Sequence, residues 1–125
     1  FAEEYAEALV QTTGLTACIT DRDVVVAAAG SGSRELDGKE ISTELDEVIS
    51  GREARLINGT DREDVSVILG HKDSFTGKMI QPILCASDAI GSVILLGKSD
   101  KNVLGEKERA LVKTAASFLG RQMEQ

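Results

Sequence analysis

The chain of 125 residues is 42% hydrophobic and 28% charged, values typical of a single globular domain and not of a disordered segment. Its net charge of −7 at pH 7 argues against a nucleic-acid-binding surface, because affinity for phosphates depends on Lys and Arg, and it argues equally against contact with anionic membranes. The sequence contains no run of about 18 apolar residues, the length that a membrane-spanning helix requires.

The first part of the chain predicts one helix and two strands. Residues 1–14 repeat an apolar or aromatic side chain at four-residue spacing, which is typical of an amphipathic helix, and Gly14 is a suitable helix end. Residues 15–20 and 24–29 are apolar, strand-like runs. The polar residues 21–23 between them predict a short turn that joins the two strands.

A second helix and a short strand follow. Residues 41–51 place their apolar side chains on one helical face, Ser42 or Thr43 can cap the first amides, and Gly51 would end the helix. Residues 54–57 predict a short strand, which is closed by a turn-prone Asn-Gly pair.

The third part of the chain predicts a loop region and a hairpin. After a polar run, residues 65–69 fit either a strand or a buried segment, and residues 71–77 form a loop. Residues 79–86 and 90–97 are apolar runs on either side of a short polar turn, which predicts a β-hairpin. Because these two runs show little polar alternation, we expect both faces of the sheet to be covered.

Residues 103–124 carry the clearest helix pattern, since apolar side chains recur there every seven residues and further apolar positions widen the stripe. A wide stripe can pack entirely against the chain's own sheet, or it can pack partly against the sheet and partly against a partner. We expect contact with a partner, in a homo-oligomer (dimer or tetramer) built through the terminal helices. Packing against the chain's own sheet alone stays open as the alternative. The predicted interface residues are Tyr5, Leu9, Leu104, Leu111, Phe118 and Met123.

The order of these elements predicts an α+β fold with a central antiparallel sheet of about five to six strands. The terminal helices would cover one face of the sheet, and the helix and loops of residues 35–78 would cover the other. Residues 1–125 are therefore expected to form a single domain.

No group of residues in the sequence has the pattern of an active site or a metal site. The two cysteines, Cys18 and Cys85, lie in apolar runs without a CxxC pattern, which favours small buried thiols in a reducing compartment. The one histidine, His71, has no metal ligands near it in sequence. Residues 30–34 are glycine-rich but lack the spacing of phosphate-binding loops, and the acidic run at residues 61–64 suits a solvated loop. We therefore expect no catalytic residue, no metal and no cofactor.

Several segments of the chain resemble one protein family. Residues 115–125 (AASFLGRQMEQ) are similar to the end of the stage V sporulation protein T family of AbrB-type sporulation transcription regulators. Residues 19–24 (ITDRDV), residues 56–59 (LING), and Pro82-Ile83 with residues 90–93 (IGSV) resemble the same family at matching intervals. The pattern of this last segment also suggests the wider GAF superfamily.

The resemblance implies a C-terminal GAF-like domain of a longer, cytoplasmic protein, with terminal helices that build multimers and a ligand pocket on the opposite face of the sheet. It also implies that an AbrB-like domain, N-terminal to this one, binds DNA. That domain is missing from the chain, which agrees with the acidic charge and with a start at Phe1 without an initiator methionine. DNA is thus expected as a partner only through the missing domain.

We expect a sensory and oligomerising domain of a sporulation transcription regulator, and not an enzyme. An unidentified small-molecule effector would bind between the sheet and residues 35–78 and would shift the packing of the terminal helices. Two alternatives stay open: a purely structural multimerisation module without a ligand, and a GAF-type enzyme such as a methionine sulfoxide reductase, which requires paired, accessible cysteines. The candidate ligand-binding residues, chosen because strands or loops should turn them toward the second layer, are Thr20, Arg55, Asn58, His71 and Cys85.

Overall fold

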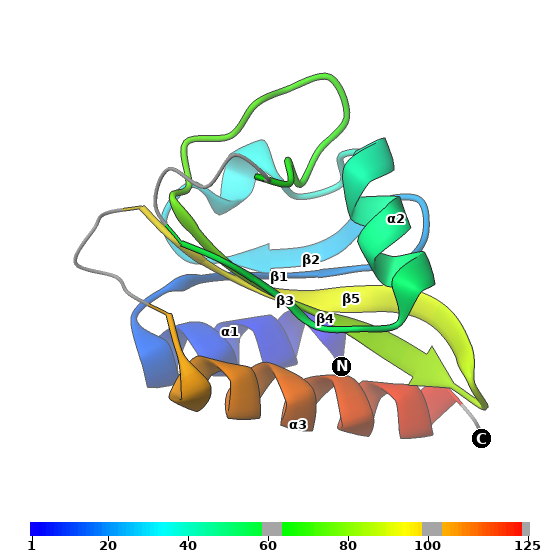
Figure 1. The fold of residues 1–125 in the computed structure, drawn as a ribbon. Helices are drawn as coiled ribbons and strands as arrows, with labels where there is room; N and C mark the ends of the chain where they lie inside the picture. The colour runs from blue at the N-terminus through cyan, green and yellow to red at the C-terminus, as the bar shows by residue number, and fades with distance from the viewer. Residues whose placement is uncertain (59–63, 99–103, 124–125) are drawn as a thin grey trace.

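The computed structural model describes residues 1–58, 64–98 and 104–123. This part of the chain contains one antiparallel sheet of five strands, in the order β2-β1-β5-β4-β3, with helices on both of its faces (Figure 1). The helices are α1 (Ala2–Thr13), α2 (Thr43–Gly51), α3 (Glu106–Met123) and a short 3-10 helix, η1 (Ser33–Glu35). The strands are β1 (Thr16–Thr20), β2 (Val25–Ala29), β3 (Arg55–Ile57), β4 (Gly77–Cys85) and β5 (Asp88–Gly97).

The terminal helices share one face of the sheet, where α1 packs on β1 and β2 and α3 packs on β4 and β5 (Figure 1). The other face is covered by α2, by η1 and by the irregular segment of residues 64–76. This is the α+β architecture that the sequence predicts, with the number of strands at the lower end of the expected range.

Local sequence signals place the ends of the first two helices. Gly14 adopts the left-handed conformation (φ 71°) and caps the last turn of α1, as predicted. Ser42 is the N-cap of α2, and its Oγ accepts a hydrogen bond from the N–H of Leu45 at 3.0 Å. Helix α2 ends at Gly51 as predicted, although the left-handed residue (φ 62°) is Arg52, which follows it.

The structure decides one open alternative and one helix boundary. Residues 65–69, predicted as either a strand or a buried segment, form a largely buried segment, and Ile68 makes an isolated β-bridge to Ile41. Helix α3 spans Glu106–Met123, so residues 104 and 105 of the predicted helix precede it, and residues 103 and 124 lie outside the described residues.

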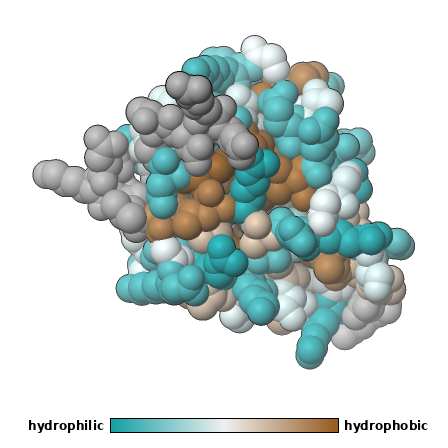
Figure 2. Space-filling model, in the orientation of Figure 1, coloured by the Kyte–Doolittle hydropathy of each residue, from teal (hydrophilic) through white to brown (hydrophobic). Residues whose placement is uncertain are grey.

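Two apolar cores lie on opposite faces of the sheet, because successive residues of a strand point to opposite sides. Leu95 of β5 belongs to the core under α1 and α3, and its neighbour Ile94 belongs to the core under α2. Figure 2 shows hydrophobic residues in a band at the level of the sheet, with hydrophilic residues over the helical layers. The hairpin strands do not alternate between polar and apolar residues because both faces of the sheet are covered, as predicted.

The apolar stripes of the terminal helices pack mainly against the chain's own sheet. Leu9 and Leu104, two of the predicted interface residues, are only 4% and 2% exposed, because they pack against the chain's own sheet. This corrects the prediction that they contact a partner. Tyr5 and Leu111 are half-buried against the same core. The broad contact with the sheet, which the sequence left open as the alternative, therefore accounts for much of the stripe.

Gly120→Ala is expected to destabilise the protein, although alanine favours helices. A Cβ at Gly120 would lie 2.2 Å from the carbonyl oxygen of Leu84, so α3 would have to move away from the end of β4. We expect the free energy of unfolding, measured by urea denaturation, to fall by about 2–3 kcal/mol. Gly51→Ala is the matched control: it lies in α2, nothing lies within 4 Å of its added Cβ, and it should be neutral or stabilising. Equal stability of the two variants would contradict the close contact.

Candidate functional site

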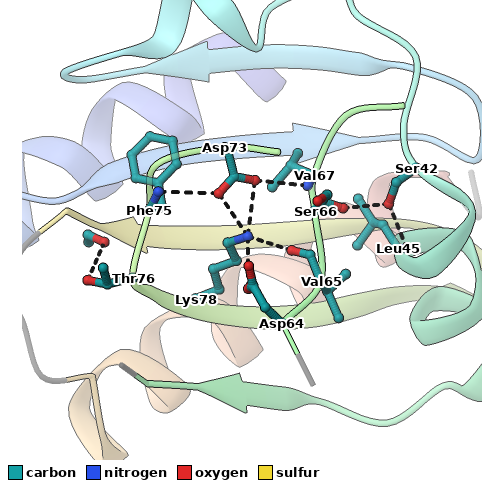
Figure 3. Close-up of polar contacts among 11 residues, drawn as sticks. Ser42, Leu45, Asp64, Val65, Ser66, Val67, Asp73, Phe75, Thr76 and Lys78 are labelled. Carbon is teal, nitrogen blue, oxygen red and sulfur yellow. Dashed lines mark hydrogen bonds and ion pairs between the residues drawn. The ribbon is translucent and has the colours of Figure 1, made fainter. Parts of the chain in front are cut away.

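A fully buried lysine lies at the centre of the layer under α2. Lys78, on β4, points away from the terminal helices, and none of its side chain is exposed. Its Nζ donates to the carbonyl oxygen of Val65 at 2.5 Å and forms ion pairs with Asp73 at 2.8 Å and with Asp64 at 3.1 Å (Figure 3). An ammonium group has three hydrogens, so each of them has an acceptor here. We call these four residues the Lys78 cluster.

Asp73 is the more buried counter-ion of Lys78 and also shapes the loop that carries it. Its side chain is only 5% exposed. One carboxylate oxygen accepts from the N–H of Val67 at 3.1 Å, and the other accepts from the N–H of Phe75 at 3.2 Å (Figure 3). The same carboxylate therefore neutralises the lysine and holds residues 67–75 in a closed turn over β4.

The burial of Lys78 explains why this cluster has to form. Moving a charged group out of water costs several kcal/mol even after the surroundings relax, and the cost is offset only by close pairing with complete hydrogen bonding. Asp64 differs from Asp73 because its side chain is 32% exposed. With one ammonium and two carboxylates, the cluster carries a net charge of −1, and Asp64 is the carboxylate that reaches solvent.

The segment of residues 64–76 is fastened to α2 as well as to β4. The hydroxyl of Ser42 donates to the carbonyl oxygen of Ser66 (Figure 3). The N–H of Ser42 donates to the carbonyl oxygen of Val67 at 2.9 Å. One serine therefore caps α2 and ties the segment to it, so the segment forms a defined layer although it contains no strand or helix.

An open hollow of about 440 Å³ lies at the rim of this layer, between α2, β3 and the start of the 64–76 segment. Four carboxylates line it, those of Glu44, Glu47, Glu53 and Asp64, together with one guanidinium, that of Arg55. The potential in this acidic hollow is therefore negative. Because Asp64 belongs both to the hollow and to the Lys78 cluster, it connects the solvent to the buried lysine. The remaining lining residues are Val48, Gly51, Ala54 and Val65.

The structure does not bring the five predicted ligand-binding residues together. Arg55 lines the acidic hollow. His71 lies in the exposed part of the 64–76 segment. Cys85 is the last residue of β4, beside the hairpin turn. Of the five, Arg55 is the one that the fold places in the same hollow as a member of the Lys78 cluster.

The other two predicted residues have partners within the chain. The Thr20 and Ser92 hydroxyls form a buried hydrogen bond, with their oxygens 2.7 Å apart, between neighbouring strands. Asn58 donates from Nδ2 to the carbonyl oxygen of Leu104 at 3.2 Å, and its Oδ1 accepts from the N–H of Leu104 at 3.4 Å. Both side chains therefore stabilise the fold. Thr20 joins β1 to β5, and Asn58 binds the backbone of Leu104, two residues before α3 begins.

The two cysteines occupy different environments. Cys18 is fully buried in the core under α2, and the pKa of its thiol is raised to about 12, mainly by burial and also by the nearby charge of Asp73, while the charge of Lys78 lowers it. Because the thiolate is the reactive form, Cys18 is inert near neutral pH. Cys85 is partly exposed at the end of β4, which corrects the prediction that both thiols are buried. Both cysteines are free.

Arg22 connects α2 to the sheet. Its Nε donates to Oδ1 of Asp46 at 2.8 Å and its Nη2 donates to the hydroxyl of Ser50 at 2.6 Å, and both partners lie on α2. Its Nη1 donates to the carbonyl oxygen of Ala89 on β5 at 3.1 Å. The hydrogen bond to Asp46 raises the pKa of Arg22 further above its usual value. A displacement of α2 would therefore pull on both the β1–β2 turn and β5.

A second surface feature lies at the end of the terminal-helix layer where α1 begins and α3 ends. Phe1, Phe118 and Met123 are 74%, 38% and 66% exposed there, and the ring of Phe118 lies 6.1 Å from that of Phe1 and 5.4 Å from that of Tyr5. Beside these rings lies a groove of about 390 Å³, the apolar groove, whose lining includes Phe1, Ile19, Val26, Ile83, Leu119 and Met123.

Sequence reasoning missed Lys78 and Asp73. The predicted hairpin begins one residue after Lys78, and Asp73 lies in the predicted loop of residues 71–77. The available signal was a single lysine at an inward position of an apolar strand, two residues before the buried Ile80. A lysine at such a position requires a buried anion, but the sequence does not say which of the acidic residues supplies it.

Two further findings concern residues 1–58, 64–98 and 104–123. No group of three or more His, Cys, Asp and Glu side chains in these residues is arranged to hold a metal ion. None of their helices combines the length and the apolar character that are needed to cross a membrane.

Comparisons with known proteins agree on a family and on a fold. The family described as "Stage V sporulation protein T C-terminal, transcription factor" matches residues 1–124. The chain is 37% identical over 125 residues to stage V sporulation protein T of Bacillus subtilis (strain 168), covering all of this chain and 68% of that protein.

Solved structures that resemble this chain include the GAF domain of an Acinetobacter phosphoenolpyruvate-protein phosphotransferase, with a TM-score of 0.76 and 9% identity, covering 96% of this chain and 77% of that one. The second GAF domain of DevS from Mycobacterium smegmatis has a TM-score of 0.73 and 12% identity, covering 97% and 88%. The type II free methionine-R-sulfoxide reductase from Thermoplasma acidophilum has a TM-score of 0.74 and 7% identity, covering 95% and 86%. At these identities the likeness concerns the fold alone.

Lys78→Met is expected to lower the free energy of unfolding by about 3–5 kcal/mol, because it leaves the carboxylate of Asp73 buried without its cation. Adding Asp73→Asn should recover part of this loss, since the unpaired charge is then removed. Lys113→Met, on the exposed side of α3, is the matched control and should change stability by less than about 0.5 kcal/mol. Urea denaturation measures all three variants. A loss in Lys78→Met no larger than in the control would show that the cluster does not form.

Cys18 should make stability depend on pH in the alkaline range. The folded-state pKa of about 12 exceeds the usual value of 9.0, so the native protein holds the thiol proton more tightly than the unfolded chain does. The resulting stabilisation is complete below pH 9.0 and is lost as the pH rises toward about 12. In this window the free energy of unfolding should fall more steeply in the wild type than in Cys18→Ala, by up to about 1.4 kcal/mol per pH unit. Identical slopes in the wild type and in Cys18→Ala would refute the shift.

Proposed function

Because the chain belongs to the family of C-terminal domains of stage V sporulation protein T transcription factors, we propose that it senses a small molecule and assembles copies of the regulator. Its membership of this family and its GAF fold make it a regulatory domain of a sporulation transcription regulator. Sensing, assembly and the absence of an enzymatic activity are the steps that go beyond this family assignment.

The exposed aromatic and apolar side chains where α1 begins and α3 ends are the observation that carries the assembly proposal. Phe1, Phe118 and Met123 lie next to the apolar groove on a chain whose net charge is −7. A second copy of the chain is the occupant that would bury these side chains, since two identical apolar surfaces of this kind can pack together around a two-fold axis. Of the residues predicted from sequence, Phe118 and Met123 remain available for such an interface.

The sensing proposal is supported by the opposite face of the sheet. The acidic hollow is open to solvent there and leads through Asp64 to the buried Lys78. Arg22 links α2, which forms one wall of the hollow, to the turn after β1 and to β5. A ligand would shift the terminal helices only if it bound one of their arrangements more tightly than the other. An α1 arrangement that is identical with and without a bound effector would exclude the sensing role.

The state of the two cysteines favours a regulatory role over that of a redox enzyme. A methionine sulfoxide reductase mechanism requires accessible, paired thiols, whereas Cys18 is fully buried and its pKa is raised to about 12. The reductase among the structural neighbours shares only 7% identity, so its activity does not transfer to this chain. Sulfoxide-reducing activity that depended on Cys18 or Cys85 would overturn this view.

We also propose that DNA is bound by an AbrB-like domain N-terminal to this one in a longer cytoplasmic protein. The net charge of −7 makes this domain a poor partner for phosphates. The Bacillus subtilis relative is longer than the matched region, since the chain covers 68% of it.

A purely structural multimerisation module is the second candidate. The observation that favours it is the filled core under α2, where Leu36, Leu45 and Ile49 are no more than 1% exposed. Because this core is filled, a ligand on this face would have to bind at its rim, where the acidic hollow lies. A search by native mass spectrometry that finds no bound metabolite, on the chain purified under non-denaturing conditions, would favour the structural role.

Met123→Glu tests the assembly proposal, because it places a charge on the proposed contact surface. We expect sedimentation equilibrium to show a dissociation constant for the oligomer raised at least about tenfold, since an unpaired charge would be buried in the contact. Leu69→Glu is the matched control, because Leu69 is 54% exposed on the other side of the sheet. A wild-type chain that is monomeric at micromolar concentration, or equal effects of the two variants, would remove the oligomerising part of the proposal.

A further inference from the structure

We propose that a small zwitterionic ligand, such as an amino acid, binds to this domain. Its carboxylate would take the place beside the Lys78 ammonium that the carboxylate of Asp64 now occupies. The ligand enters through the acidic hollow, displaces Asp64 and pairs with Lys78 in its place. This inference rests on the sensing role proposed above, and it names both the ligand class and the group that binds it.

Two of the three acceptors of Lys78 are permanent parts of the fold. Val65 contributes a backbone carbonyl. Asp73 contacts Lys78 through both carboxylate oxygens, at 2.8 and 3.0 Å, and the same oxygens accept the N–H groups of Val67 and Phe75. Loss of Asp73 would leave two buried backbone donors without an acceptor and would remove the more buried counter-ion of the ammonium, which is costly.

Asp64 is held less firmly. Among the described residues it forms one ion pair, to Lys78 at 3.1 Å, and its side chain is 32% exposed. It also lines the acidic hollow, so a solute in the hollow can approach Lys78 from the side of Asp64. Moving Asp64 aside breaks this one ion pair and returns a partly exposed carboxylate to water. Because the incoming carboxylate takes over the same ion pair, the buried ammonium keeps an acceptor for each of its hydrogens after the exchange.

The charge balance of the cluster selects a monocarboxylate. Exchanging Asp64 for another carboxylate leaves one ammonium with two carboxylates, so no additional charge is buried. A neutral ligand would replace an ion pair with a hydrogen bond in which only the ammonium is charged, which is weaker. A phosphate would bring a larger negative charge into a cluster whose net charge is already negative.

The walls of the hollow select a positive group at the other end of the ligand. Glu44, Glu47 and Glu53 repel a second carboxylate and attract an ammonium group. The buried ammonium behind Asp64 and the carboxylates around it therefore match the two ends of a zwitterion.

Asp64→Ala opens the position on Lys78, and solutes with the same carbon chain length test what fills it. Butyrate, γ-aminobutyrate, succinate and butylamine are titrated separately at an ionic strength held constant with sodium chloride. Binding is followed by the shift in Tm and by amide NMR signals of Val65 and Lys78. We expect γ-aminobutyrate to bind Asp64→Ala about tenfold more tightly than it binds the wild type, because no carboxylate has to be displaced. Butyrate should bind more weakly than γ-aminobutyrate, and succinate more weakly than butyrate.

The matched control is Asp88→Ala, which removes an exposed carboxylate at the start of β5 and should behave as the wild type does. Butylamine that binds as well as γ-aminobutyrate would overturn the proposal, because it would show general attraction of cations to the acidic hollow. The absence of any carboxylate-dependent shift in Asp64→Ala would overturn it as well. If Asp64→Ala does not fold, Asp64→Asn has nearly the same shape and is titrated in the same way, with the same expected order.

The outcome is separable from that of the sensing proposal. If γ-aminobutyrate binds Asp64→Ala as expected, but saturating the wild type with it leaves the arrangement of α1 and α3 unchanged, the site is preserved and sensing is excluded. No binding to Asp64→Ala, together with a different metabolite that moves the terminal helices, would exclude the site and preserve sensing.

Discussion

The positive charge of Lys78 has no access to water, and this constraint organises one whole side of the molecule. A buried ammonium must be paired with an anion, so Asp73 has to lie over β4, and the turn that Asp73 holds together has to follow it. Helix α2 then packs on this turn through Ser42. An irregular segment thereby acquires a defined position that its own backbone would not provide.

The terminal-helix side depends on different physics. Its buried core side chains are apolar, and α3 approaches the sheet so closely that only glycine fits at position 120. One face of the sheet is therefore held by non-directional packing, and the other combines an apolar core with directional charge pairs. The two meet in the same strands, because β4 carries Lys78 toward one face and Met79 toward the other.

The candidate site shows where sequence reasoning reaches its limit. The burial of Cys18 was predictable, because apolar neighbours surround it in a central strand, whereas Cys85 is partly exposed because it is the residue where β4 ends. Thr20 was expected to face a ligand, but the register of β1 against β5 places it next to Ser92, which satisfies its hydroxyl. Register is a property of strand pairing, and a single strand does not contain it.

The amino-acid sequence by itself determined most of the helices and strands, the cap at Gly14, the covering of both sheet faces and the family, because periodicity, capping and local motifs are carried by residues close together in the chain. Only the tertiary structure decided that the stripes on α1 and α3 turn Leu9 and Leu104 inward, and that Lys78 is buried against Asp64 and Asp73. The reason is physical: the environment of a side chain depends on what the rest of the chain places around it. For a buried charge, that placement determines whether the fold is possible at all.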